Sequence, residues 1–316
     1  MFVVCGEALF DVFAAGETPT GLTLDARIGG SPFNVAVGLA RLGQPVGFFG
    51  GVSTGFLGER LMRALQEEGV DTRCTPRSAA RTTLSLVGID AQGVPSYSFY
   101  GDHAADRDVA AEALARVPPE ARAFHVGSYA TVVEPVASVQ RALIEREHGR
   151  SLISFDPNIR LNVEPDLGRW HALLDWMLPR THLLKVSDED LRLLFPGVAP
   201  AELAAQWLAR GVALVVVTRG GEGAQGWTAA GTAQAHPVRV DVVDTVGAGD
   251  TFQAALLTWL AEQGGLAPEA LRAQPPAALA AALAFAARAA AITCSRRGAD
   301  LPRRSELPRE AGIGIG

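Results

Sequence analysis

The sequence has almost no lysine and a small excess of acidic residues. Lys185 is the only lysine among 28 Lys and Arg, which face 34 Asp and Glu for a formal net charge of −6. A surface that binds nucleic acid needs clustered cations to meet the phosphates. The charge balance therefore argues against a nucleic-acid partner, and it makes the lone Lys185 a position to follow.

Cysteine is also scarce. The three cysteines, Cys5, Cys74 and Cys294, lie far apart and form no CxxC pair, and the six histidines form no HExxH or other short metal-ligand spacing. These absences argue against a disulfide framework and against a zinc site. Together with an N-terminus that lacks a basic leader segment, they predict a reducing, cytoplasmic location.

Long apolar runs are rare as well. The single candidate for a membrane span, residues 277–294, is rich in alanine and carries Arg288, so we expect a buried core helix and no membrane. With 48% hydrophobic and 20% charged residues, the chain has the composition of a globular protein.

Two common nucleotide-binding motifs are missing. The glycine-rich segment 218–224 follows a strongly apolar stretch, but it is neither a GxGxxG that opens a helix nor a GxxxxGK[ST] motif. The sequence therefore indicates neither a dinucleotide fingerprint nor a Walker P-loop. If a nucleotide binds, another element must hold its phosphates.

Short apolar stretches alternate with helix-length segments along most of the chain. We expect strands at residues 2–5, 46–49, 124–126, 152–155, 182–186 and 214–218, and helices at residues 59–68, 135–147, 167–178 and 201–209. Continuously apolar strands joined by helices are typical of a parallel sheet covered on both faces. The predicted fold class is therefore α/β, as a three-layer α/β/α arrangement.

Two early segments break this alternation. Residues 12–28 contain strand-like pieces, and residues 82–101 have the pattern of a hairpin that turns at Asp90-Ala91-Gln92-Gly93. A plain surface hairpin would give the same pattern. We expect a small β-sheet lid inserted in a single domain, residues 1–316, although length alone is also compatible with two domains.

The segment Gly29-Gly30-Ser31-Pro32-Phe33-Asn34 has the pattern of a helix start that can hold a ligand. Ser31 is the expected N-cap, Pro32 suits the first helical position, and Gly43 is placed to end the helix. The glycines allow a ligand to approach the backbone, and Asn34 offers a donor and an acceptor to hydroxyl groups. A tight loop with an exposed asparagine would show the same residues.

A second segment, Asp244-Thr245-Val246-Gly247-Ala248-Gly249-Asp250-Thr251-Phe252, opens a predicted helix with small residues. Their unobstructed N–H groups and the helix dipole make an anion site. Asp250 lies near the start of this helix, where a carboxylate is most often a cap or a dipole partner. Beside an anion site it can instead take a proton from an attacking hydroxyl. The residues alone leave both interpretations open.

Charged and polar groups follow several of the predicted strands. These positions are Arg160 after residues 152–155, Lys185, Ser187 and Asp190 at the end of residues 182–186, and Tyr100 and Arg107 after the hairpin. Because the carboxyl ends of parallel strands meet at one edge of a sheet, we expect a common cleft there.

These segments together resemble the ribokinase-like carbohydrate kinases, or PfkB family, over essentially the whole chain. The run from Gly29 through Gly50-Gly51-Val52 to Gly58 is similar to the family's N-terminal signature, and residues 244–252 are similar to its C-terminal one. Two separate signatures in the right order form a specific combination. The resemblance implies an α/β core with a β-sheet lid, ATP as phosphoryl donor, and Mg²⁺.

The resemblance also implies roles for individual residues. Asp250 is the expected base, and Gly247, Ala248 and Gly249 complete the anion site with it. The expected sugar-binding residues are Asp11, Gly30, Asn34, Tyr100, Arg107 and Arg160, and the expected nucleotide-binding residues are Lys185, Ser187, Thr218, Gly220 and Gly223. K⁺ is expected beside Asp244 and residues 295–298, and Asp190 is linked to Mg²⁺, although Ser187-x-x-Asp190 replaces the family's Asn-x-x-Glu.

Within the family, several segments look most like bacterial fructokinases, among them Cys5-Gly6-Glu7-Ala8-Leu9-Phe10-Asp11 and Asp156-Pro157-Asn158-Ile159-Arg160. This implies transfer of the ATP γ-phosphate to the 6-hydroxyl of D-fructose. 2-Keto-3-deoxygluconate kinases share several of these segments, and their acid substrate would need a cation such as Arg107 or Arg160.

Further functions are compatible with the same residues. The chain could be a different PfkB sugar or nucleoside kinase, or a sugar-binding protein of the same fold without catalysis. An NAD-linked oxidoreductase is disfavoured because the dinucleotide fingerprint is missing. The apolar faces of the expected lid also make a homodimer a candidate.

Overall fold

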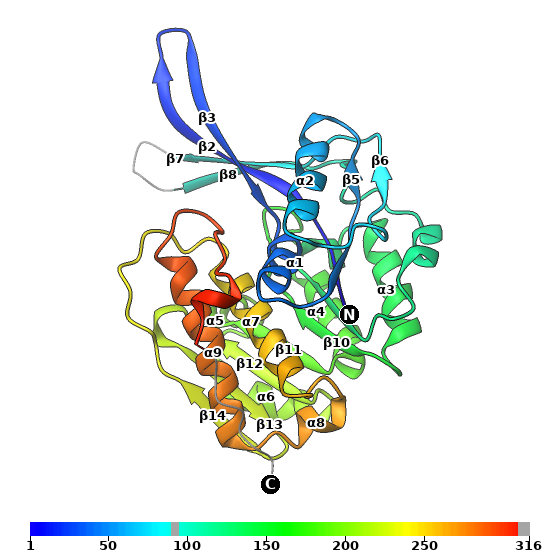
Figure 1. The fold of residues 1–316 in the computed structure, drawn as a ribbon, viewed down its shortest axis with the longest axis vertical. Coiled ribbons are helices and arrows are strands. Elements are labelled where there is room, and N and C mark those ends of the chain that lie inside the picture. The colour runs from blue at the N-terminus through cyan, green and yellow to red at the C-terminus, as the bar shows by residue number, and fades with distance from the viewer. Residues whose placement is uncertain (90–94, 309–316) are drawn as a thin grey trace.

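The computed structural model describes residues 1–89 and 95–308 of the chain. The expected turn at Asp90-Ala91-Gln92-Gly93 therefore lies outside the described residues. Two sheets dominate the structure, a large one covered by helices and a small one above it in Figure 1.

The large sheet has the strand order β14-β13-β12-β11-β10-β9-β1-β4. Its strands are β1 (Phe2–Cys5), β4 (Val46–Phe49), β9 (Ala123–Gly127), β10 (Leu152–Asp156), β11 (Leu183–Ser187), β12 (Leu214–Thr218), β13 (Ala224–Thr228) and β14 (Gly231–Ala235). All neighbours from β4 to β12 pair in parallel, whereas β13 and β14 are antiparallel additions at the edge. The expected parallel strands are confirmed. β13 and β14 were not predicted because small residues replace the apolar runs there.

The chain changes direction across the large sheet at β1. It passes from β1 to β4 on one side and later returns to β9 on the other side, from which it continues outward to β12. In open α/β sheets, ligands bind beyond the carboxyl ends of the strands at such a switch point. The fold therefore directs attention to the segment that follows β1.

Helices cover both faces of the large sheet and create two hydrophobic cores. β1 shows the alternation, because Phe2 and Val4 belong to one core and Val3 and Cys5 to the other. The first core includes α1 (Ser31–Arg41), α2 (Phe56–Glu67), α7 (Ala248–Glu262), α8 (Pro268–Arg272) and α9 (Pro276–Cys294). The second includes α3 (Val136–Glu147), α4 (Leu167–Met177), α5 (Asp188–Leu194) and α6 (Pro200–Ala209). The three-layer prediction is confirmed.

Short elements complete the chain. They are the paired strands β5 (Val52–Ser53) and β6 (Arg77–Ser78) and the 3₁₀ turns η1 (Ala111–Arg116), η2 (Tyr129–Thr131), η3 (Leu178–Arg180), η4 (Gly220–Glu222) and η5 (Arg304–Glu306).

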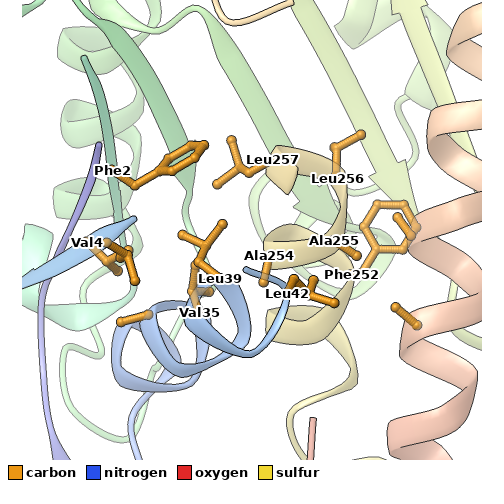
Figure 2. Packing of buried hydrophobic residues seen from close by; sticks show 14 of the residues in the cluster. Phe2, Val4, Val35, Leu39, Leu42, Phe252, Ala254, Ala255, Leu256 and Leu257 are labelled. Carbon is orange, nitrogen blue, oxygen red and sulfur yellow. The ribbon is translucent and has the colours of Figure 1, made fainter. Parts of the chain in front are cut away.

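α1 and α7 pack side by side over β1, as Figure 2 shows for Val35 and Leu39 of α1 beside Ala254 of α7. Gly38 makes this close contact possible. A Cβ atom at Gly38 would lie 2.7 Å from the Cβ of Ala254 and 2.5 Å from Cδ2 of Leu301. The glycine therefore sets how closely the two helices approach each other.

The start of α1 differs from the prediction. Ser31 is the first residue of the helix, Gly30 is its N-cap with φ 105°, and no side chain caps the helix. The expected N-cap role of Ser31 is therefore wrong, because its hydroxyl bonds to another helix, as described below. The end agrees with the prediction: Gly43 has φ 85° and its N–H donates to the carbonyl of Ala40.

The small sheet has the strand order β3-β2-β7-β8. Its strands are β2 (Leu9–Thr18), β3 (Gly21–Gly29), β7 (Leu84–Ile89) and β8 (Pro95–Tyr100). The two early segments thus join in one sheet, as expected, but the first begins at Leu9 and forms a long hairpin that projects from the molecule (Figure 1). β2 pairs in parallel with β7, which connects the two hairpins.

α9 is the helix, among those described, that is long and apolar enough to cross a membrane by length and composition. Its residues Leu279, Leu283 and Phe285 are fully buried in the core that also contains α7. The prediction of a core helix is confirmed.

Candidate active site

A cleft of about 1350 Å³ lies at the carboxyl ends of the large sheet's strands and extends to the small sheet. Most predicted site residues line it: Asp11, Gly30, Asn34, Arg160, Lys185, Ser187, Asp190, Thr218, Gly220, Gly223, Gly247, Ala248, Gly249 and Asp250. Tyr100, Arg107 and Asp244 do not. Because ordinary small-molecule pockets hold about 300–1,000 Å³, the cleft has room for two substrates side by side.

Both oxygens of the Asp250 carboxylate are held by α1. The Ser31 hydroxyl donates to Oδ1 at 2.6 Å, and Nδ2 of Asn34 donates to Oδ2 at 2.8 Å. Asp250 lies in the first turn of α7, whose N-cap is Gly247, and no side-chain cap is formed there. The carboxylate is therefore positioned by a neighbouring helix and not used to cap its own. Each oxygen keeps a lone pair that can accept a further proton.

The turn that starts α7 leaves its N–H groups open. Gly247 has φ 77°, and a Cβ there would lie 2.6 Å from the Cβ of Ala299, so only glycine fits. Gly249 is exposed, and a Cβ at this position would lie 3.2 Å from Nζ of Lys185. A helix N-terminus with an ammonium group beside it forms a strong anion site.

Lys185 is buried and paired with Asp156. Its Nζ donates to Oδ2 of Asp156 at 2.7 Å, and both side chains are almost inaccessible. Burial lowers the pKa of Lys185, but the attraction of Asp156, its hydrogen bond, and the charges of Asp250 and Asp190 outweigh burial and raise the pKa above its ordinary value. Lys185 is therefore a permanent cation beneath the α7 turn.

Two loops line the far end of the cleft, away from α1. Thr218 ends β12, and Gly220 follows with φ 48° and open space around it. Gly223 has φ 92°, and a Cβ there would lie 2.1 Å from the carbonyl oxygen of Ala235. Gly223 therefore has a structural reason to be glycine, while Thr218 and Gly220 leave space for a ligand.

Ser187 and Asp190 connect α5 to the loop after β10. The Ser187 hydroxyl accepts from the N–H of Asp190 and caps α5, and Oδ1 of Asp190 accepts from the N–H of Ile159 at 3.0 Å. Burial, followed by repulsion from Asp156, raises the pKa of Asp190. Among residues 1–89 and 95–308, no three His, Cys, Asp or Glu side chains cluster as a metal site.

These residues nevertheless fit a magnesium ion that arrives with phosphates. Mg²⁺ in such sites uses one or two carboxylates, water and substrate phosphates. Asp190 lines the cleft, and Oδ1 of Asp156 is buried without a partner in the described structure.

Asp244 joins two loops beside the start of α7. Its carboxylate accepts from the N–H of Val246 at 3.0 Å and from the N–H of Gly298 at 2.8 Å. The expected proximity of Asp244 to residues 295–298 is confirmed. Because both oxygens already bind amides, backbone carbonyls would have to supply much of the coordination of K⁺.

Tyr100 and Arg107 lie away from the cleft wall. Tyr100 is 62% exposed, while the Arg107 guanidinium packs over the rings of Phe99 and Tyr129 and pairs with Asp102 at 3.5 Å. Arg107 thus supports residues that line the cleft, and of the two cations considered for an acid substrate, only Arg160 lines it.

Four polar residues illustrate what the prediction of the site missed. Ser31 donates a hydrogen bond to Asp250, and Asp156 accepts one from Lys185. Glu7, which follows β1, and Ser128, which follows β9, line the cleft. Burial is the main reason that the pKa of Glu7 is raised to about 8. Glu7 and Asp156 each lie at the end of an apolar strand, and this position in the sequence could have indicated them as candidate site residues.

Comparison with known proteins identifies the family. Residues 1–306 match the pfkB family of carbohydrate kinases. The chain belongs to this family. It is therefore a phosphotransferase that acts on a sugar hydroxyl, and the interpretation as an NAD-linked oxidoreductase is wrong.

Fructokinases are among the relatives. The chain is 36% identical over 263 residues to a fructokinase of Rhizobium leguminosarum bv. trifolii, covering 82% of this chain and 79% of that one. A crystal structure of fructokinase with bound ATP from Xylella fastidiosa is 30% identical, with a TM-score of 0.83 and coverage of 97% and 94%. Fructokinase from Vibrio cholerae O395 in fructose, ADP and calcium ion bound form is 26% identical, with a TM-score of 0.78 and coverage of 94% of each chain.

Proposed function

We propose that this carbohydrate kinase transfers the γ-phosphate of ATP to the 6-hydroxyl of D-fructose. The observation that carries the proposal is the Asp250 carboxylate, held by Ser31 and Asn34 beside the open N-terminus of α7. The fructokinase relatives, including those with bound ATP or with fructose and ADP, support the choice of substrates.

Asp250 acts as the general base in this proposal. Ser31 and Asn34 fix the orientation of its carboxylate, so a free lone pair faces the hydroxyl that attacks the phosphate. The proton moves from this hydroxyl to Asp250 as the new O–P bond forms, while the bond between the γ-phosphorus and the bridging oxygen of ATP breaks and ADP leaves. Asp11, Gly30 and Asn34 line the part of the cleft next to Asp250, which we call the sugar end.

The α7 turn meets the transferring phosphate. The N–H groups of Gly247, Ala248 and Gly249 and the nearby Lys185 ammonium stabilise the negative charge that develops there. Thr218, Gly220 and Gly223 border the nucleotide, and Arg160 is a further phosphate-side cation. A Mg²⁺ ion held by the phosphates and Asp190 would neutralise part of the phosphate charge.

A neutral sugar fits the sugar end better than an acid sugar does. Asp11 and Asp250 line the cleft there, and Arg107 is turned away behind Phe99. Arg160 favours 2-keto-3-deoxygluconate instead, because it lines the cleft and could bind a carboxylate.

The whole chain acts as one kinase domain in this proposal, with the small sheet as a lid that excludes water from the reaction. K⁺ binds at the loops joined by Asp244, and the enzyme works in the cytoplasm. Two copies pair through their small sheets, because Leu22 and Leu24 on β3 are 63% and 51% exposed.

A coupled assay of ADP release tests the proposed function. Purified enzyme is given MgATP with fructose, 2-keto-3-deoxygluconate, ribose or adenosine, and kcat/KM is compared. We expect the highest value with fructose. A higher kcat/KM with 2-keto-3-deoxygluconate would identify that sugar as the substrate in place of fructose. If no acceptor caused release of ADP, a sugar-binding protein without catalysis would be favoured.

A further inference from the structure

Glu7 lies directly after β1, at the switch point of the large sheet. β1 pairs with β4 on one side and with β9 on the other, which places this exit at the centre of the crevice. The Glu7 side chain is only 1% exposed, yet it lines the cleft together with Asp11 and Ser128. Glu7 is therefore part of the floor of the sugar end.

One oxygen of the Glu7 carboxyl has no hydrogen-bond partner in residues 1–89 and 95–308. This atom is Oε2, and the side chain that carries it is buried. A buried polar atom without a partner destabilises the folded protein, so native structures contain few of them. A ligand group in the cleft would satisfy this atom.

The surroundings of Glu7 favour its protonated form. Burial raises the pKa of Glu7 to about 8, Asp106 adds to the increase, and the Ser128 bond and Arg160 oppose it. A proton on Oε2, which has no partner among residues 1–89 and 95–308, makes this atom a donor that a ligand can use. Asp106 already accepts from the hydroxyls of Thr83 and Tyr129.

Glu7 is also held rigidly. A Cβ at Gly30 would lie 2.6 Å from the carbonyl oxygen of Glu7, so the turn that starts α1 packs directly against it. Ser128 is buried in a rare backbone conformation for a non-glycine residue, with φ 57° and ψ −165°. Such conformations persist where surrounding contacts fix them, often at functional sites. The backbone that carries Glu7 is therefore fixed by the turn that starts α1.

We propose that Glu7 binds the acceptor sugar by donating a hydrogen bond from Oε2 to one of its hydroxyl oxygens. This inference rests on the proposed sugar kinase function. The neighbouring Asp250 carboxylate can only accept hydrogen bonds, whereas sugar hydroxyl oxygens also need donors. Glu7 supplies a donor on this side of the cleft and helps to fix the orientation of the sugar.

The first test replaces Glu7 by leucine, with Gln140→Leu as a matched control. Gln140 is also 1% exposed, and both of its amide atoms lack a partner in the described structure, but it lies on α3 outside the cleft. Glu7→Leu should raise the sugar KM at least ~10-fold, leave the ATP KM within ~2-fold, and not lower the Tm. Gln140→Leu should leave both KM values unchanged. A sugar KM within ~2-fold of wild type in Glu7→Leu would overturn the proposal.

The second test uses Glu7→Gln, which keeps a donor but cannot ionise. At pH 7 its sugar KM should stay within ~3-fold of wild type. Between pH 7 and 9 the wild-type sugar KM should rise as Glu7 loses its proton, whereas that of Glu7→Gln should not. Parallel pH profiles of KM in the two enzymes would contradict the role of Glu7. If Glu7→Leu does not fold, the comparison of Glu7→Gln with wild type decides the question alone.

The pH dependence of thermal stability is an independent measure of whether the Glu7 carboxyl is protonated. The folded pKa of Glu7, about 8, lies above its ordinary value of 4.5, so the stabilisation present below pH 4.5 is lost as the pH rises through 8. The Tm of Glu7→Gln relative to wild type should therefore increase over this range. A wild-type enzyme that phosphorylates no sugar would refute the proposed function, whereas an active enzyme with unchanged Glu7 variants would refute only this inference.

Discussion

At the residue scale, Asp250 takes its role from contacts that lie far away in the sequence. An aspartate in the first turn of a helix commonly stabilises that helix. Here its two oxygens accept from Ser31 and Asn34 on α1, more than 200 positions earlier in the chain. The sequence left capping and base catalysis open, and the contacts with α1 favour catalysis because they hold the carboxylate at the anion site.

Replacing Asp250 by asparagine removes the proposed base and keeps the shape of the side chain. We expect kcat to fall at least ~100-fold, which is the usual size of a general-base contribution, with little change in the KM for ATP. The measurement is the coupled ADP assay with fructose. Asp175→Asn on the exposed surface of α4 should retain full activity. Near-normal turnover of Asp250→Asn would show that another group takes the proton.

Variants of Lys185 and Asp156 test the role of the buried ion pair that these two residues form. Lys185→Met should destabilise the protein by ~3–5 kcal/mol, because it leaves Asp156 buried without its partner. Adding Asp156→Leu removes this lone charge and should recover most of the stability. Activity should stay low in the double variant, since the cation under the α7 turn is gone.

Denaturant unfolding measures the stability of these variants and the ADP assay their activity. If activity returned together with stability, Lys185 would have only a structural role. The scarcity of lysine in the sequence drew attention to Lys185. Its partner was not foreseen, because the pairing depends on the register of β10 with β11.

At the scale of elements, the contact between α1 and α7 brings the two signature segments together. Gly38 on α1 faces Ala254, one turn after Asp250 on α7. The sequence predicted both helices and the small residues in them. It did not predict that one face of α1 would carry Ser31, Asn34 and Gly38 against α7, since helix pairing is decided by packing.

Gly38→Ala should therefore disturb the site from a distance. The added methyl group would clash with Leu301 and Ala254, and overpacking of this kind costs ~1–3 kcal/mol. Because the clash separates α1 from α7, kcat should fall as well. Gly149→Ala is the control, since a Cβ at Gly149 meets nothing within 4 Å. Thermal unfolding and the ADP assay compare the two, and equal behaviour would mean that the helices adapt without moving Asp250.

At the scale of the whole molecule, the two sheets have different surroundings. The large sheet is covered by helices on both faces, while the small sheet extends away from the core at the top of Figure 1. A sheet with exposed apolar side chains and unpaired edges is a surface for association. The exposed Leu22 and Leu24 lie two residues apart on β3 and so share one face.

Leu22→Ser combined with Leu24→Ser should convert the proposed dimer to a monomer. Light scattering after size-exclusion chromatography measures the mass, and each wild-type subunit contributes 33.2 kDa. Thr23→Ser is the control, because it lies between the two leucines and leaves both of them in place. Its mass should equal that of the wild type. A wild-type mass of one subunit at micromolar concentration would contradict pairing through the small sheet.

The sequence alone predicted the parallel α/β core and both strand-rich segments of the small sheet, and most of the site residues that it indicated line the cleft. They do so because apolar periodicity and glycine-rich helix starts are local properties of the chain. Three-dimensional packing was needed to show that Ser31 binds Asp250, that Asp156 pairs with Lys185, and that Arg107 lies behind the cleft wall. These contacts depend on strand order, register and helix packing, which join residues that are distant in the sequence and therefore have no local signal.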